Sequence, residues 1–162
     1  MSIDTPITAD ADNISSRQYW MSILARANFD TLQSLWQEVC KGLHLNPNYQ
    51  PLRPAEIGMV MVRASVNGNG APFNMGEATT TRCSVQMDSG EIGSAYILGR
   101  NKPHAELAAV IDGELQRGDW NQQITQQLLE PLANLEKGRQ NKRQQKAAKT
   151  KVDFFTLLRG ED

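Results

Sequence analysis

Apolar side chains recur at helical spacing near the start of the chain. A first stripe consists of Ile14, Trp20, Met21, Leu24 and Ala25. A second stripe consists of Phe29, Leu32, Leu35, Trp36, Val39 and Leu43. Such stripes are typical of amphipathic helices, which Ser15 or Ser16 would cap in the first case and Asp30 with Gln33 in the second. The pattern therefore predicts two consecutive helices that form an αα-hairpin.

The period of the pattern changes to two after a segment rich in proline. The stretch 46–48, with Pro51 and Pro54, is predicted to interrupt regular structure. The strands predicted beyond it are 57–66, 79–87 and 92–98. Asn67–Gly70 and Asp88–Gly90 have the composition of tight turns between them. Together these segments predict an antiparallel meander with one face to cover.

Helical spacing returns after the third predicted strand. The apolar face of the next helix consists of His104, Leu107, Ala108, Ile111 and Leu115, with Pro103 in the first turn and Gly118 past the end. The helical spacing continues through Ile124, Leu128, Leu132 and Leu135, and Pro131 is expected to kink or divide that segment. The predicted fold class is α+β, an antiparallel β-meander of about three strands flanked by helices. It includes the N-terminal αα-hairpin and a long basic C-terminal helix with an apolar end.

The length of 162 residues suits one compact domain. We expect a disordered leader over 1–13, a single α+β domain over 14–136, and an arm with a docking segment over 137–162. No stretch is long and apolar enough to span a membrane, and the acidic N-terminus lacks the features of a secretory signal. These features predict a cytoplasmic protein.

The two cysteines, Cys40 and Cys83, are expected to stay reduced in such a protein. Cys40 and His44 could share a helix face, but Gly42 lies between them and His104 is the other histidine. Structural zinc usually takes four ligands, so we predict no metal site.

The net charge of −1 conceals a separation of charge along the chain. Seven basic and no acidic residues lie between Lys137 and Lys151. The other residues carry 10 basic and 18 acidic side chains, about −8 in total. The body is therefore acidic and its tail is basic.

The basic run has no apolar face of its own. On a helix, one side carries Arg139, Lys142, Arg143, Lys146 and Lys149, whereas the other sides carry glutamine, asparagine and alanine. An apolar patch follows, and each of its large side chains would gain ~1.5 to 3 kcal/mol on burial. Three interpretations stay open: a solvated arm, a strut that returns the patch to the body, and an arm that docks into another subunit. We favour docking, with partner-binding residues Arg139, Lys142, Arg143, Lys146, Phe154, Phe155, Leu157 and Leu158.

A second candidate site joins the third strand to the next helix. Arg100 and Lys102 bring positive charge to a helix start, where free backbone N–H groups favour an anion and Asn101 can cap. Arg100, Lys102 and His104 are therefore candidate ligands of a phosphate or carboxylate. The alternative role for His104, which we favour, is a partly buried and hydrogen-bonded side chain.

Five blocks of sequence, in order, resemble the PhnG family of subunits of the bacterial carbon-phosphorus lyase core complex. They are Arg17–Ala25 (R-x-x-W-M-x-x-L-A), Arg53–Gly58, Gly76–Arg82, Gly99–Glu106 (G-R-x-K-x-H-A-E) and Val152–Gly160. Each block alone is a weak signal, but together they extend from about residue 16 to 160. The longer leader and the Gln/Lys-rich stretch before the last block depart from the family pattern.

The resemblance implies membership in an assembly. In that family PhnG joins PhnH, PhnI and PhnJ, two copies of each, with PhnL associated. They take part in forming α-D-ribose 1-methylphosphonate 5-triphosphate from ATP and methylphosphonate. The resemblance implies no catalytic residue and no cofactor in this chain, with ATP a substrate of the complex. The residues agree, because the sequence has no nucleophile-base set, paired carboxylates, Walker loop or cysteine cluster.

A different function, a nucleic-acid-binding module, would use the same basic helix. Its affinity would come from counterion release. The acidic body and the lack of aromatic side chains among the basic residues argue against it.

Overall fold

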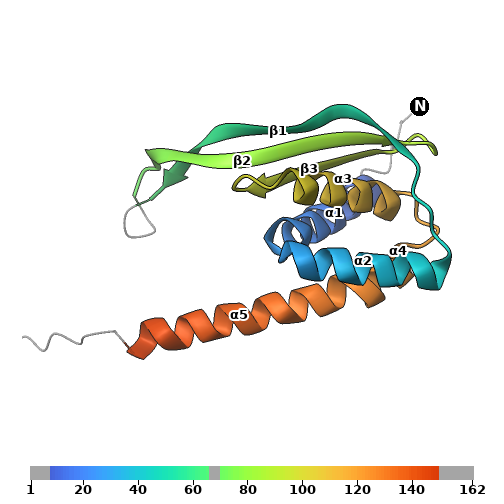
Figure 1. The fold of residues 1–162 in the computed structure, drawn as a ribbon. Helices are drawn as coiled ribbons and strands as arrows, with labels where there is room; N and C mark the ends of the chain where they lie inside the picture. The colour runs from blue at the N-terminus through green and yellow to red at the C-terminus, as the bar shows by residue number, and fades with distance from the viewer. Residues whose placement is uncertain (1–7, 66–69, 150–162) are drawn as a thin grey trace, which may run out of the picture.

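Helices cover one face of a three-stranded antiparallel sheet in the computed structural model, which describes residues 8–65 and 70–149 (Figure 1). The strands lie in the order β1 (Tyr49–Ala64), β2 (Phe73–Met87) and β3 (Ile92–Leu98). The helices are α1 (Thr8–Arg26), α2 (Phe29–Leu43), α3 (Lys102–Gln116), α4 (Asn121–Ile124) and α5 (Glu130–Lys149), with a π-helical segment η1 (Thr125–Leu129) before α5. The predicted α+β class, with its meander and long C-terminal helix, is confirmed.

The core lies between the sheet and helices α1, α2, α3 and η1. α3 packs on β2 and β3, α1 packs on α3 and β3, and α2 and α5 form the next layer, as Figure 1 shows. Close approach of α3 to the sheet depends on Gly93, because a Cβ there would lie 1.9 Å from the carbonyl oxygen of Ala109. Fully buried leucine, isoleucine and valine side chains fill the interior: Leu24, Leu32, Val39, Val85, Ile111, Leu115, Ile124 and Leu128.

β1 corrects one prediction about the prolines. The strand begins at Tyr49 and continues through Pro51 and Pro54, so these residues do not interrupt regular structure. β1 is an edge strand, where a proline can leave its missing N–H on the open side. Register shifts between Pro51 and Arg53 and between Arg53 and Glu56 accommodate both rings.

The other two strands agree with the pattern to different degrees. β3 has the predicted bounds, and the turn at Asp88–Gly90 is confirmed, with Gly90 at φ 107°. β2 begins at Phe73, six residues before the predicted start at Thr79. The predicted turn at Asn67–Gly70 lies largely outside the described residues.

The helix starts differ from the predicted caps. α1 begins at Thr8, so neither Ser15 nor Ser16 caps it. The cap of α2 is Asn28, whose side chain accepts from the backbone N–H of Thr31 at 3.1 Å, and the predicted Asp30–Gln33 pair is wrong. Both errors arise because apolar periodicity locates the buried part of a helix and not its first turn.

Pro131 divides the last helical segment as predicted. The backbone changes from α4 through the π-helical η1 to α5 just before this residue. Proline lacks the N–H that an α-helix would pair with the carbonyl four residues earlier. Within the described part of the chain, no helix combines the length and apolar character that crossing a membrane requires.

Beyond the end of β3, strands β1 and β2 continue alone as a two-stranded ribbon. The last pair between β2 and β3 is Thr80 with Leu98. β1 and β2 remain paired from Met59 with Thr79 to Ala64 with Phe73. We call residues 59–64 and 73–79 the distal ribbon. In Figure 1 it extends past the helices on the same side of the view as α5.

Candidate functional site

A fully buried carboxylate, Asp112 of α3, joins α1, α3 and β3. Its Oδ1 accepts from Trp20 Nε1 at 2.8 Å and from Arg17 Nε at 3.2 Å. Its Oδ2 accepts from Arg17 Nη2 at 2.7 Å, from the backbone N–H of Ser94 at 2.9 Å and from Gln116 Nε2 at 3.2 Å. Five donors occupy the two oxygens, so this group holds the scaffold together and has no lone pair directed at a substrate.

The Asp112 cluster was missed by the sequence analysis, although one signal was present. Arg17 and Trp20 stand three residues apart in the first block, which places both on one face of a helix. Their shared partner lies more than ninety residues away, at a position with no periodic or motif signal of its own.

The first four sequence blocks are linked to one another by side-chain contacts. Arg82 Nε lies 2.6 Å from Glu56 Oε1, which joins the third block to the second. Thr81 Oγ1 donates to the carbonyl oxygen of Gly99 at 2.7 Å, which joins the third block to the fourth. Nε2 of His104 lies 2.8 Å from the carbonyl oxygen of Leu24, which joins the fourth block to the first. Several residues of the family pattern therefore stabilise the fold by joining the blocks to one another.

The structure separates the three candidate anion ligands. His104 is buried, its ring lies against Phe29, and burial lowers the pKa of its imidazole despite the contact with the Leu24 carbonyl. The favoured role of His104, a buried and hydrogen-bonded side chain, is confirmed. Arg100 and Lys102 are exposed at the start of α3.

One backbone amide in the first turn of α3 is already capped. The Asn101 side chain accepts from the backbone N–H of His104 at 3.0 Å, as predicted. The Asn101 carbonyl accepts from the N–H of Ala105 at 3.1 Å. An anion bound here would rely mainly on the Arg100 and Lys102 side chains, and their role stays a prediction.

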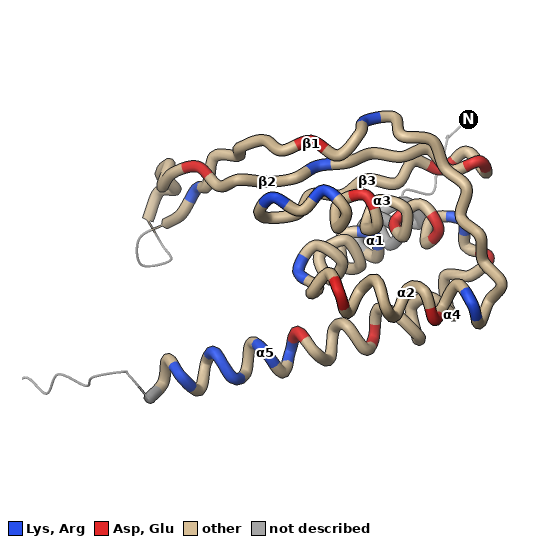
Figure 2. Tube along the Cα trace, viewed as in Figure 1, with Lys and Arg blue, Asp and Glu red and all other residues tan. Residues whose placement is uncertain are grey.

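The basic part of α5 is helical and exposed. Figure 2 shows lysine and arginine positions, in blue, recurring along its outer half. Arg139 differs from the others, because it forms an ion pair with Glu136 and donates to the Arg26 carbonyl at 2.9 Å, which anchors the helix to the body. Residues 140–148 are all exposed, including Lys142, Arg143 and Lys146. The predicted apolar residues Phe154, Phe155, Leu157 and Leu158 lie outside the described residues.

Within the described residues, the half-buried Cys40 and the buried Cys83 and Glu114 do not form a reactive group. Cys40 and Cys83 are free, and burial raises the pKa of both thiols, which disfavours the nucleophilic thiolate. Burial also raises the pKa of Glu114, whereas its ion pair with Arg117 at 3.2 Å opposes that shift. Among the described residues, no three histidine, cysteine, aspartate or glutamate side chains are grouped to hold a metal.

These observations define an α+β scaffold whose polar clusters stabilise the fold and whose ribbon and basic helix extend from it. The family model described as Phosphonate metabolism protein PhnG matches residues 15–160, and the chain belongs to this family. A relative from Rhizobium meliloti (strain 1021) is the alpha-D-ribose 1-methylphosphonate 5-triphosphate synthase subunit PhnG. It is 36% identical over 160 residues, which cover 99% of each chain.

Proposed function

We propose that the chain is an accessory subunit of the complex that forms α-D-ribose 1-methylphosphonate 5-triphosphate from ATP and methylphosphonate. It acts in the cytoplasm with PhnH, PhnI and PhnL, in an assembly that also holds PhnJ and two copies of each core subunit. ATP is a substrate of the assembly, and this chain supplies contacts. Family membership and the relative that matches almost the whole chain support this proposal.

The basic half of α5 is the observation that carries the docking role. Residues 140–148 leave the body and bury none of their side chains. A helix without an apolar face gains no packing energy and is marginal in water at this length. Like charges at i, i+4, such as Lys142 and Lys146, cost a further ~0.2 to 0.5 kcal/mol per pair. An acidic surface on a partner would remove this repulsion and fix the helix.

Co-expression of the tagged chain with untagged PhnH, PhnI and PhnJ tests the proposal. The wild-type chain should retain all three through purification, and adding PhnL should permit product formation from ATP and methylphosphonate. The variant K142E/K146E should retain at least about tenfold less of the partners, because two attractive contacts become repulsive. Lys41→Glu, which changes an exposed lysine on α2, is the matched control and should behave as wild type.

The outcomes separate the parts of the proposal. A wild-type chain that neither binds the partners nor is needed for product formation would refute the accessory role. Equal retention by K142E/K146E and wild type would refute docking through α5. Salt-dependent binding of the purified chain to duplex DNA, lost in the same variant, would favour the nucleic-acid-binding alternative instead.

A further inference from the structure

The distal ribbon exposes large apolar side chains on both of its faces. The exposed fractions are 68% for Met59, 40% for Val60, 52% for Met61 and 38% for Val62. Successive side chains of a strand point to opposite faces, so Met59 and Met61 share one face and Val60 and Val62 share the other. Phe73 and Met75 on β2 are exposed as well.

The two faces of the ribbon differ in polarity. On the valine face, Val60 pairs with Ala78 and Val62 with Gly76, whereas on the methionine face Met59 pairs with Thr79 and Met61 with Glu77. Nearer the body, polar side chains alternate along β2 with buried ones, so Arg82, Ser84 and Gln86 share the outer face. Within the ribbon, Arg63 and Glu77 are the charged residues. A two-stranded ribbon is marginally stable by itself in water, and an exposed apolar strand edge favours association. The ribbon therefore has the composition of a buried element.

We propose that the distal ribbon inserts into an apolar cleft of a different subunit of the synthase, an inference that rests on the proposed function. A flat apolar surface would cover Met59 and Met61 or Val60 and Val62, whereas a cleft covers both pairs. The wall that meets Val60 and Val62 is apolar, whereas the wall that meets Met59 and Met61 also offers a polar partner to Glu77.

Two hollows on the described surface of this chain are too small to receive the ribbon of a second copy. A ribbon strand of six residues is about 20 Å long. The hollow between α2 and α3, lined by Phe29, Trp36 and Tyr49, has a volume of about 340 Å³. The hollow beside Tyr19 and Leu129 has a volume of about 450 Å³. Each has room for a few side chains and not for two paired strands.

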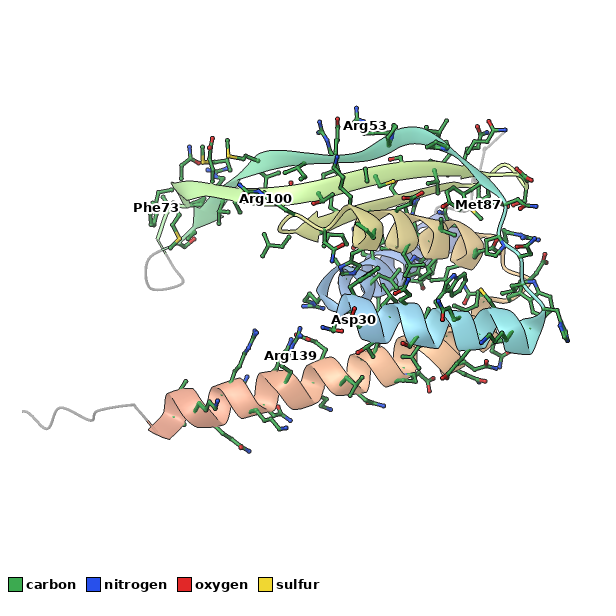
Figure 3. The ribbon with its side chains drawn as sticks, in the orientation of Figure 1. Asp30, Arg53, Phe73, Met87, Arg100 and Arg139 are labelled. Atoms are coloured by element: carbon green, nitrogen blue, oxygen red, sulfur yellow. The ribbon has the colours of Figure 1, made fainter. Side chains whose placement is uncertain are left out.

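The position of α5 adds a second property of the partner. In Figure 3, Phe73 lies at the tip of the ribbon and Arg139 at the root of the exposed part of α5. Both elements extend past the helical body on the same side of this view. A subunit that receives both would combine an apolar cleft with a neighbouring acidic surface.

Threonine substitutions test each face separately, because threonine keeps the β-propensity of the strand and removes apolar contact. The variants are M59T/M61T and V60T/V62T, and the matched control is Ile92→Thr, which changes an exposed apolar residue of β3. We expect each double variant to retain at least about tenfold less of co-expressed PhnH, PhnI and PhnJ than wild type does. The control should retain as much as wild type, and all variants should unfold at the wild-type temperature when isolated.

Hydrogen exchange of the wild-type chain supplies a second measurement. Amides of residues 59–64 and 73–79 should exchange more slowly in the purified assembly than in the isolated chain. Equal retention of partners by both double variants, with unchanged exchange, would overturn the inference while the accessory role stands. Loss in only one double variant would overturn the cleft. A dimer of the isolated chain that both double variants abolish would identify a second copy as the occupant and also overturn it.

Discussion

Substituting Asp112 with asparagine tests whether the buried carboxylate holds the scaffold together. The change keeps the size of the side chain but replaces one oxygen by an amide that donates hydrogen bonds. Whichever way the amide is oriented, it meets donors: Arg17 Nε and Trp20 Nε1 on one side, or Arg17 Nη2, Ser94 N–H and Gln116 Nε2 on the other. At least two donors then lose their acceptor.

The size of the expected stability loss follows from the burial of the ion pair between Asp112 and Arg17. Removing one partner of a buried ion pair usually costs about 3 to 5 kcal/mol. The Arg17 side chain is 35% exposed, so water can solvate part of the freed guanidinium. We therefore expect D112N to lower the free energy of unfolding by about 2 to 4 kcal/mol. For a protein of this size, that loss lowers Tm by roughly 6 to 12 °C.

Thermal and urea unfolding followed by circular dichroism measure this loss. The control is Asp119→Asn, because Asp119 is 70% exposed and lies 3.7 Å from Arg117. A surface pair of this kind contributes about 0 to 1 kcal/mol, so the control should unfold close to wild type. If D112N and D119N lowered Tm equally, the argument that Asp112 joins α1, α3 and β3 would be wrong.

Two further predictions concern α3. Gly93→Ala should lower the free energy of unfolding by about 3 kcal/mol, because the new methyl group meets the Ala109 backbone. Gly113→Ala should cost less, because its methyl group meets the flexible Met87 side chain at 2.6 Å. Equal losses of stability in urea unfolding would contradict this contrast. Burial lowers the pKa of His104, so the unfolded chain binds a proton that the folded chain resists. The stability that His104 contributes is complete above its ordinary pKa of 6.5 and is lost as the pH falls through the folded pKa. The stability difference between wild type and His104→Gln should therefore shrink from pH 7 to pH 5, and a difference constant with pH would refute the assignment.

The sequence pattern predicted elements where one face is buried and the other is solvated. β3 alternates in this way from Ile92 to Leu98, and its bounds were predicted correctly. The alternation fails at the start of β2, where Phe73–Ala78 has no buried face to mark it, and the predicted strand began too late. The start of β1 could not be predicted from its prolines, because a strand tolerates proline at the open edge of a sheet, and the edge position is a property of the topology.

The polar clusters were harder to predict because their partners are remote or belong to the backbone. The apolar face of α3 indicated a buried His104, but its contact with the Leu24 carbonyl has no side-chain signal at Leu24. The Gly99–Glu106 segment predicted the Asn101 cap correctly because that interaction is local. Helical spacing places Arg139 on the same side as the predicted docking residues, but it does not reveal the neighbouring Arg26 carbonyl to which Arg139 donates a hydrogen bond.

If a partner covers the distal ribbon, a copy of the chain made without that partner keeps the ribbon exposed. Until its methionines and valines are covered, the free chain presents the surface that chaperones and proteases recognise and that drives aggregation. Surplus copies would be degraded, so the steady amount of this subunit would follow the supply of whatever protein shields it. Overproduction of the chain without that protein should lower the fraction of it that stays soluble, and balanced synthesis should raise that fraction again.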